Sequence, residues 1–433
     1  MNNKIPPNGT TVTLCMIVKD ESHIIEECLN SMYPYINRYD ITDTGSTDGT
    51  QDIIKKFFEE KEIPGEVYQS DWKGFGKSRT EAFENAKSKA DYAWVIDADD
   101  YIEGDFQYPE KMDADAYTLR IGRDDFVWWR SQIFKLKSNC KYVGILHEYA
   151  DCSKDDGTPS IIEKLHGDYY IRARTLGGRN VGVDPIEKYS KDAEILLSAL
   201  TDENDPNYEP ENGRYQFYLA QSYFDSQQWE KSEDAYQKRV EMGGWEEETY
   251  YSKFRIAIIK ALRNSSWPEI QQAFLDAWEF RPIRAEPLYQ IARLYRQVHD
   301  RPRLAYFYAK MALEIPYPQD DILFISDDVY KWQLLDELSS TAFYAGKPHI
   351  GYAASKKLID DNFFPENHKE RITNNCNSYE KIVADIQNKE ISRKIQEDAS
   401  IMKQKRIEKE QKKNKEKKST KINQDKSGFK KRK

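Results

Sequence analysis

The sequence contains no run of 18 apolar residues, the length expected of a membrane-spanning helix, and its first residues lack the apolar segment of a signal peptide. We therefore expect a cytoplasmic protein. Cysteine is scarce as well, because the five cysteines are scattered, odd in number and without CxxC spacing. This pattern points to neither a disulfide framework nor a zinc site, and it predicts reduced thiols.

A glycine-rich phosphate loop is also missing after the first apolar run, where Val18 leads directly into Lys19, Asp20 and Glu21. A nucleotidyl transferase on an α/β fold would need such a loop, so this class is disfavoured. The length of 433 residues exceeds one ordinary core and predicts two or three domains.

Charge is divided unevenly along the chain. Residues 401–433 contain 15 Lys or Arg and 4 Asp or Glu, a net charge of +11, whereas the whole chain carries −9 and residues 1–400 therefore carry −20. From about residue 386 the composition predicts a fraying helix followed by disorder. The basic tail suits contact with an anionic membrane surface, or a solubilising or self-associating function. Its single aromatic residue, Phe429, argues against a nucleic-acid site built on stacking.

The first 100 residues alternate between expected strands and expected helices. Apolar and β-branched runs predict strands over residues 11–18, 41–43, 67–69 and 92–96, and helical periodicity predicts helices over 24–32, 53–57 and 76–90. This alternation predicts a parallel sheet, whose ligands bind beyond the carboxyl ends of the strands. Asp43 and Asp97 both fall at such ends.

Three carboxylates, Asp97, Asp99 and Asp100, follow the strand that contains Trp94. Crowded carboxylates persist where a hard cation offsets their charge, and Mn²⁺ or Mg²⁺ is held by one or two carboxylates together with substrate phosphates. The pattern therefore favours a metal-bound diphosphate, although an isolated Asp-x-Asp is more often an acidic turn.

Three ordered motifs give the chain its resemblance to a known family. They are Cys-Met-Ile-Val-Lys-Asp-Glu at 15–21, Asp-Thr-Gly-Ser-Thr-Asp-Gly-Thr at 43–50 and Trp-Val-Ile-Asp-Ala-Asp-Asp at 94–100. Residues 10–150 resemble glycosyltransferase family 2, the inverting enzymes with a GT-A, nucleotide-diphospho-sugar transferase-like fold.

The resemblance implies roles for particular residues. Lys19, Glu21 and Asp43 would contact the nucleoside, and Asp97 would lie near the ribose and diphosphate. Asp99 would ligate the metal. His147 resembles a histidine that lies close to the metal or diphosphate in some members, although a lone histidine is more often structural.

Two basic residues, Lys77 and Arg79, stand where family members have polar groups over the ribose and phosphates. A solvated helix face is an equally good interpretation of this pair. Asp48 is better explained as a turn residue than as a ligand.

An inverting transfer needs a general base for the acceptor hydroxyl. The candidates are Glu148, then Asp125, then Asp124. Trp128 and Trp129 could form a wall against a sugar ring, but we expect them to belong to the core, because aromatic side chains are buried for their area.

Residues 186–385 have an entirely helical, quasi-repetitive pattern. Ala220, Ala257 and Ala292 are spaced by 37 and 35 residues, close to the ~34-residue period of tetratricopeptide repeats, and residues 334–354 suggest a further pair. The fold class expected is thus an α/β domain followed by an all-α, tetratricopeptide-like domain.

The expected domains are an extension over 1–9, a catalytic domain over 10–150, a connection over 151–185, the helical domain over 186–385 and the basic tail over 386–433. We expect a metal-dependent inverting glycosyltransferase that uses a nucleoside diphosphate sugar, UDP-linked, and a hydroxyl acceptor on a protein, glycan or lipid. The alternative is an inactive, helical-repeat binding or scaffold protein.

Overall fold

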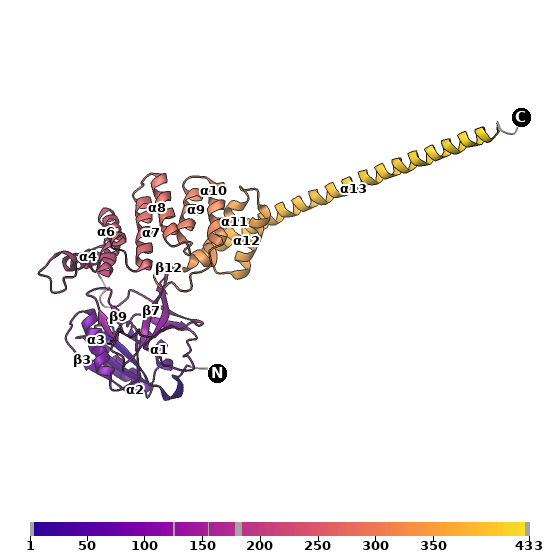
Figure 1. Ribbon diagram of the computed structural model, residues 1–433. Coiled ribbons are helices and arrows are strands. Elements are labelled where there is room, and N and C mark those ends of the chain that lie inside the picture. The colour runs from indigo at the N-terminus through magenta and orange to yellow at the C-terminus, as the bar shows by residue number, and fades with distance from the viewer. Residues whose placement is uncertain (1–3, 124–125, 155, 178–183, 429–433) are drawn as a thin grey trace. The chain divides into compact units, whose positions relative to one another are not determined.

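The structure is a computed structural model that describes residues 4–123, 126–154, 156–177 and 184–428 (Figure 1). By internal contacts the chain divides into two compact units, residues 1–291 with 311–330, and residues 292–310 with 331–433. The candidate site described below lies within the first unit.

The first unit contains a large mixed sheet and a small hairpin. The strands are β1 (Val12–Val18), β2 (Arg38–Asp43), β3 (Gly65–Gln69), β4 (Tyr92–Val95), β5 (Tyr101–Gly104), β6 (Ala116–Arg123), β7 (Phe126–Lys135), β8 (Lys141–Val143), β9 (Tyr149–Asp151), β10 (Ile162–Lys164), β11 (Tyr169–Arg172) and β12 (Ile325–Ser326). Their order in the large sheet is β3-β2-β1-β4-β7-β6-β11-β5, with β10 beside β6 and β12 beside β7, while β8 and β9 form the hairpin.

The helices follow the sequence periodicity closely. They are α1 (Ile25–Met32), α2 (Thr50–Glu60), α3 (Phe75–Ala86), α4 (Pro185–Thr201), α5 (Gly213–Asp225), α6 (Trp229–Met242), α7 (Glu246–Leu262), α8 (Trp267–Phe280), α9 (Glu286–Gln297), α10 (Pro302–Leu313), α11 (Leu334–Ala342), α12 (Pro348–Asp361) and α13 (Lys369–Gly428), with short 3-10 or π turns at Pro7–Gly9, Tyr33–Tyr35, Val329–Gln333 and Glu366–His368.

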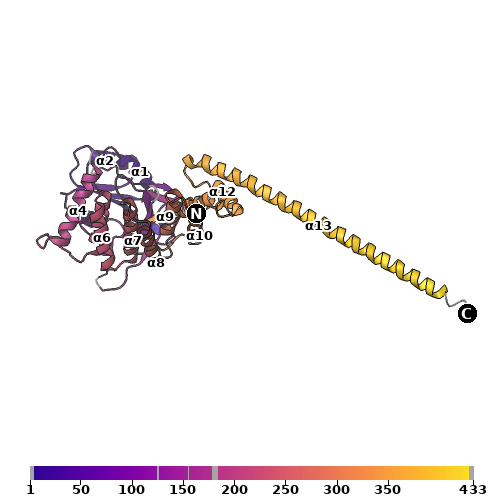
Figure 2. The same cartoon turned by 90° about the horizontal axis from the view of Figure 1, so that it is seen from above.

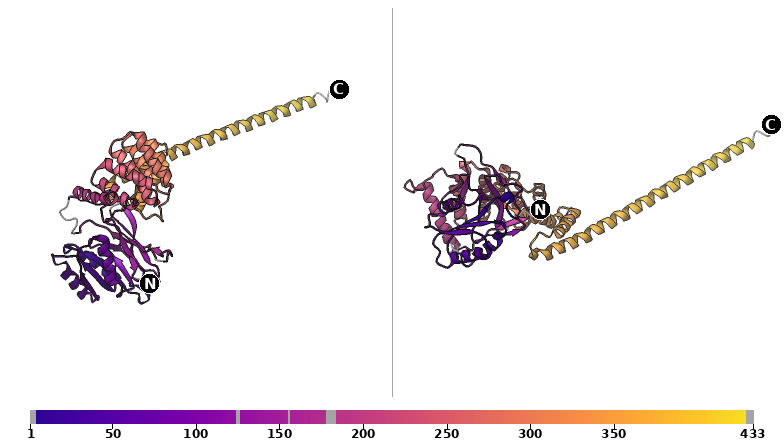
Figure 3. Two further views of the ribbon diagram at one scale, coloured as in Figure 1. Left: turned by 60° about the vertical axis from the view of Figure 1, so that its left-hand side comes forward. Right: turned by 90° about the horizontal axis from the view of Figure 1, so that it is seen from below.

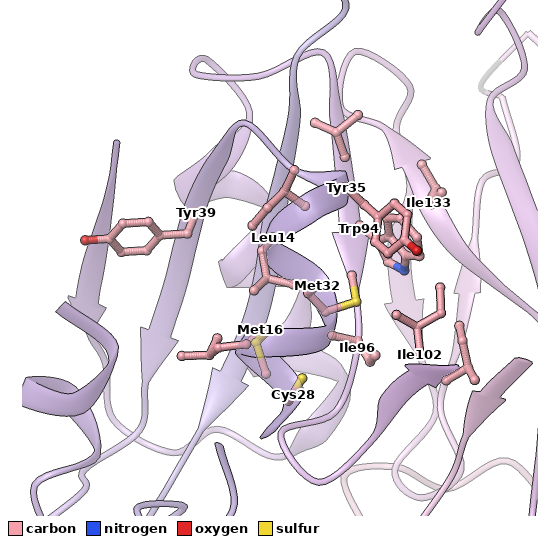
Figure 4. Close-up of a cluster of buried hydrophobic side chains, with 14 of the residues drawn as sticks. Leu14, Met16, Cys28, Met32, Tyr35, Tyr39, Trp94, Ile96, Ile102 and Ile133 are labelled. Carbon is pink, nitrogen blue, oxygen red and sulfur yellow. The ribbon is translucent and has the colours of Figure 1, made fainter. Parts of the chain in front are cut away.

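The centre of the sheet is parallel because β1 pairs with both β2 and β4 in that sense. Both faces of β1 are buried, so its side chains alternate between two apolar layers. Leu14 and Met16 pack with residues of α1 and α2, whereas Cys15 packs with residues of α3 on the other face. Figure 4 shows the first of these layers around Trp94. The predicted α/β fold class is confirmed.

The sheet extends beyond the expected catalytic segment. Strands β10 and β11 lie within residues 151–185, which sequence analysis assigns to a connection, and both pair with β6. Strand β12 comes from the expected helical domain and pairs with β7. The sequence boundary at residue 150 therefore falls inside the folded sheet, because strands as short as β10 and β12 have too few residues to show a periodic pattern.

Helices follow residue 184, as the predicted helical class requires. Helix α5 packs with α6. Helix α7 packs with α8, beside which it lies in Figure 1. Ala220 and Ala257 are fully buried, and the Ser232 hydroxyl donates to the Ala220 carbonyl over 2.8 Å. Small residues at these positions allow the paired helices to approach closely.

The tail differs from the prediction. The structure describes one continuous helix, α13, through Gly428, where sequence analysis predicts fraying and disorder (Figures 2 and 3). Lys, Glu and Gln are good helix formers, which explains a helix in a segment with few apolar anchors. Within the described residues, every helix is too short or too polar to cross a membrane.

Trp94 gives a test of the sheet core. Its side chain is fully buried, and its ring centroid lies 4.7 Å from that of Phe106. Trp94→Ala should lower the free energy of unfolding of this unit by about 3–5 kcal/mol in chemical denaturation, because a large cavity replaces the indole. Trp72→Ala is the control, since Trp72 is 45% exposed. Equal denaturation midpoints for the two variants would contradict the assigned core.

Candidate functional site

The carboxyl ends of β2, β1 and β4 lie next to one another in the sheet. Asp43 ends β2 and is paired in register with Val18, the last residue of β1. Lys19 and Glu21 follow β1, and Asp97 follows β4 by two residues. The fold therefore gathers the backbone positions of the predicted nucleotide-binding residues at one edge of the sheet.

Asp43 is buried, and among the described residues only one of its oxygens has a hydrogen-bond partner. Its Oδ1 accepts hydrogen bonds from the backbone amides of Gly45 and Ser46 and from the Gln51 side chain. Its Oδ2 is buried without a hydrogen-bond partner among the described residues. A buried acceptor without a partner costs about 1–3 kcal/mol, so a ligand that donates to this oxygen would relieve that cost.

Asp48 organises the turn that follows Asp43. Its carboxylate accepts from the backbone amides of Ser22 and Thr50 and from the Thr50 hydroxyl. The amide of Glu21 in turn donates to the Thr50 hydroxyl oxygen over 2.8 Å. These bonds fasten the segment after β1 to the start of α2, as expected of a turn residue.

Arg79 of α3 joins two of the predicted site carboxylates. Its Nε donates to Glu148 Oε1 over 2.8 Å, and a terminal nitrogen donates to Asp97 Oδ1 over 2.5 Å. Arg130 of β7 approaches Asp97 Oδ2 at 3.5 Å. Burial opposes the ionisation of Asp97, but the two guanidinium groups outweigh it and hold the pKa of this carboxyl well below its ordinary value.

The other two carboxylates after β4 contact the segment that follows β11. Asp99 Oδ2 accepts from the backbone amides of Leu176 and Gly177, both over 2.8 Å. Asp100 accepts from the amide of Arg174 over 3.0 Å. Burial, followed by the nearby charge of Asp97, raises the pKa of Asp100 to about 8. Three neighbouring carboxylates thus have three separate sets of partners.

The predicted metal pair, Asp99 and His147, does not belong to any group of three or more metal-ligating side chains in the part of the chain that the structure describes. His147 is exposed, and its ring stacks on Tyr218 with centroids 3.9 Å apart. Lys77 is exposed on α3, whereas Arg79 on the same helix is not. Asp124 and Asp125 lie outside the described residues.

A cavity of 1180 Å³ lies beside Asp97 within the first unit. One wall comes from the strands and the hairpin and includes Arg79, Asp97, Arg130, Tyr142 and Glu148. The opposite wall comes from α5 to α7 and includes Arg214, Tyr218, Glu248, Tyr251 and Arg255. A space of this size accommodates a ligand larger than a single small metabolite.

Trp128 and Trp129 line this cavity and are half-buried. Trp128 packs against the hydrophobic core of the sheet, as expected, whereas the Trp129 ring lies beside His166 with centroids 5.0 Å apart. The sheet ends near them, and the amide of Trp129 donates to the Ile322 carbonyl. These rings are available to a ligand in the cavity.

Sequence reasoning missed Arg130 and every lining residue from the helices. Arg130 stands directly after the tryptophan pair, and its charge next to two aromatic residues was the available signal. Arg214 and Glu248 had no local signal, because charged residues are common on helix surfaces.

The hairpin that carries Glu148 is closed by a disulfide between Cys140 and Cys152. This pairing corrects the prediction of reduced thiols for these two residues, while Cys15, Cys28 and Cys376 are free. A spacing of twelve residues has no recognisable motif; strands β8 and β9 bring the two cysteines together.

The comparisons with known proteins concern parts of the chain. Residues 13–116 match the family model described as glycosyl transferase family 2. The prophage-derived glycosyltransferase SunS of Bacillus subtilis is 39% identical over 89 residues, which cover 21% of this chain and 20% of that protein. A TPR repeat-containing protein of Synechococcus elongatus is 33% identical over 152 residues, covering 33% of this chain and 36% of that protein. The chain thus spans well under half the length of these relatives.

Solved structures are more distant. The Staphylococcus aureus TarS fragment 1–349 in complex with UDP-GlcNAc is 13% identical with a TM-score of 0.32, and the match covers 60% of this chain and 93% of that chain. BtubC of P. vanneervenii is 18% identical with a TM-score of 0.32, covering 42% of this chain and 76% of that chain. Likenesses at this level carry no argument about function.

Arg79→Gln tests the carboxylate bridge. Removing the guanidinium leaves Asp97 and Glu148 without their shared partner and should cost about 2 kcal/mol at pH 7, less than the ~3–5 kcal/mol of a fully buried pair because Asp97 is 31% exposed. The pKa of Asp97 is depressed in the folded state. The stabilisation from its ion pair is therefore fully present above about pH 4, the ordinary pKa of an aspartate, and is lost as the pH falls toward the folded-state pKa. The difference between wild type and variant, measured by chemical denaturation, should therefore shrink below pH 4. Lys77→Gln on the exposed face of α3 is the control, and a constant difference across pH would contradict the bridge.

The disulfide is tested by replacing Cys140 and Cys152 with serine. Closure of a loop of this length contributes about 3 kcal/mol, so the double variant should unfold at a lower temperature. Dithiothreitol should lower the thermal midpoint of the wild type and leave that of the double variant unchanged. Cys376→Ser should behave like the wild type. A wild-type midpoint that is insensitive to the reductant would argue against the pairing.

Proposed function

Because residues 13–116 match glycosyltransferase family 2, we propose that the protein is a glycosyltransferase that uses a nucleoside diphosphate sugar, UDP-linked, as its donor. The sugar passes to a hydroxyl acceptor with inversion of the anomeric centre. The observation that carries the proposal is the position of Asp43 at the end of β2 and of Asp97 just after β4, on the two sides of β1. Arg79 and Arg130 lie beside Asp97, and these three residues line the large cavity.

Asp43 is the proposed contact for the nucleobase. Its buried Oδ2 lacks a partner among the described residues, and a uracil N–H is a donor that would satisfy it. Lys19 and Glu21 follow the neighbouring strand and are proposed to contact the nucleoside. This assignment accounts for a buried carboxylate oxygen that has no partner among the described residues.

Arg79, Arg130 and Asp97 are the proposed groups around the diphosphate. Departure of a nucleoside diphosphate builds negative charge on its terminal phosphate, and preorganised guanidinium groups stabilise that charge as it forms. Lys77 is exposed nearby on α3 and is proposed as an additional cation.

A divalent cation, Mn²⁺ or Mg²⁺, is proposed at Asp99, with His147 as a further candidate ligand. Such ions take one or two protein carboxylates and complete their coordination with phosphate oxygens and water. A protein cluster of three ligands is therefore unnecessary, and the amides of Leu176 and Gly177 already orient the Asp99 carboxylate.

Glu148 is the first proposed general base, followed by Asp125 and Asp124. It lines the cavity and is linked to Asp97 through Arg79, which is consistent with a position between donor and acceptor. The acceptor, a hydroxyl on a protein, glycan or lipid, is proposed to enter along the helical wall of the cavity. Contact of the basic tail with an anionic membrane remains a prediction from the sequence.

Calorimetric titration with UDP, GDP, CDP and TDP, with Mn²⁺ or with a chelator, tests this proposal without knowledge of the acceptor. We expect metal-dependent binding of UDP with a preference of at least tenfold over CDP, because N3 of uracil carries a proton that can be donated to Asp43 and N3 of cytosine does not. TDP carries the same N3–H as UDP, so Asp43 alone does not discriminate between these two. Asp99→Asn should lose the metal dependence and keep the thermal midpoint, whereas Asp52→Asn on exposed α2 should bind as the wild type does. Absence of nucleotide binding by folded wild-type protein would favour an inactive helical-repeat binding protein.

A further inference from the structure

The turn between β8 and β9 carries Glu148 and is held from the helical side of the cavity. Arg214, in the first turn of α5, donates from Nε and from a terminal nitrogen to the carbonyl oxygen of His147, over 3.0 and 2.9 Å. Two charge-assisted bonds from one guanidinium give a fixed direction as well as energy. This carbonyl belongs to the peptide bond that leads directly into Glu148.

The backbone at this point needs such a partner. His147 has a φ of 52°, a left-handed conformation that a residue other than glycine keeps only when its surroundings hold it. The stacked Tyr218 ring of the same helix α5 holds the His147 side chain, while Arg214 holds its carbonyl. Helix α5 therefore helps to fix the backbone position of the next residue, Glu148.

Arg214 is itself held by a buried ion pair between α6 and α7. Its NH1 lies 3.6 Å from Glu248 Oε1, and Glu248 Oε2 accepts from Arg239 over 2.9 Å. The side chains of Glu248 and Arg239 are only 4% and 2% exposed, so this pair is part of the interior of the helices. Because Glu248 is held in place by Arg239, its contact restricts the position of the Arg214 guanidinium.

A continuous polar chain results. It runs from the buried Arg239–Glu248 pair through Arg214 to the His147 carbonyl, and from Glu148 through Arg79 to Asp97. Every link is a contact between described residues of the first unit. Contacts through the hairpin turn thus connect helices α5 to α7 with the Asp97 carboxylate.

We infer that Arg214 is a positioning residue that sets the place of Glu148 through the carbonyl of His147, so that the first repeat helix is a working part of the site. The inference deepens the proposed function and rests on it for the role of Glu148. Arg214 does not need to touch either substrate for this role. A displacement of about 1 Å at a reacting group costs on the order of 100-fold in rate, so loss of this support should be visible in turnover.

The first measurement is hydrogen–deuterium exchange of the hairpin, residues 141–151, in the full-length protein. Arg214→Ala should speed exchange there about tenfold, because two charge-assisted bonds that hold the turn are lost. Arg263→Ala is the matched control, since Arg263 also pairs with two carboxylates of the same helical region, Glu230 and Glu233, but does not line the cavity. Unchanged hairpin exchange in Arg214→Ala overturns the inference.

The second measurement is the release of UDP from UDP-GlcNAc and UDP-glucose with water as the acceptor. Arg214→Ala should lower kcat about tenfold and leave the donor KM within about twofold, because Arg214 positions a group used in the reaction rather than the donor. In a Glu148→Gln background, Arg214→Ala should have little additional effect, since both changes act through the same carboxylate. If kcat of the double variant falls by the product of the two single-variant losses, the two residues act independently, and the inference that Arg214 acts through Glu148 is overturned.

The two failures are distinguishable. A wild type that neither binds UDP nor releases it from either donor contradicts the proposed function, and in that case hairpin exchange alone decides whether Arg214 holds the turn. A wild type that turns over the donor, with Arg214→Ala equal to Arg263→Ala in both exchange and kcat, contradicts only the inference.

Discussion

The rest of the site depends on the two ion pairs that the Arg79 guanidinium makes with Asp97 and Glu148. The guanidinium lies between Asp97, after the central strand β4, and Glu148, in the hairpin turn, and it donates to both. Without it, Asp97 would retain only Arg130 at 3.5 Å, and Glu148 would lose this ion pair, so the desolvation of the two carboxylates would be less well offset. This side chain of α3 therefore links the sheet edge to the hairpin, and its charge helps to hold the pKa of the Asp97 carboxyl well below its ordinary value.

The hairpin needs more than this bridge, because a two-stranded ribbon is marginally stable by itself. The Cys140–Cys152 disulfide closes its base, and Arg214 and Tyr218 of α5 hold its turn. The helical segment is thus joined to the sheet side of the first unit through contacts that include the hairpin turn, the pairing of β12 with β7, and the bonds of Lys164 to the carbonyls of Gln319 and Asp321. This arrangement explains why the cavity has one wall from each kind of structure.

The parts of the fold that could be predicted are those with a periodic signal. Strands β1, β2 and β4 read as apolar runs because they are buried on both faces, and α1 to α3 read as amphipathic helices between them. The glycines and carboxylates of residues 43–50 indicated a turn, and Asp48 has that role. By contrast, β10 and β12 are three and two residues long, and nothing in so short a segment distinguishes a strand from a loop.

The sequence by itself determined the class of the protein, an α/β domain followed by helices, and the backbone positions of Asp43, Asp97 and Asp99 at strand ends, because burial imposes a pattern on every residue of such elements. Only the tertiary structure decided the partners of those carboxylates. Arg79, Arg130 and Arg214 lie on three different elements. The contacts of Arg79 and Arg130 with the carboxylates, and of Arg214 with the His147 carbonyl, depend on how strands, hairpin and helices pack. The disulfide has the same origin, since two cysteines pair only where the chain brings them within bonding distance.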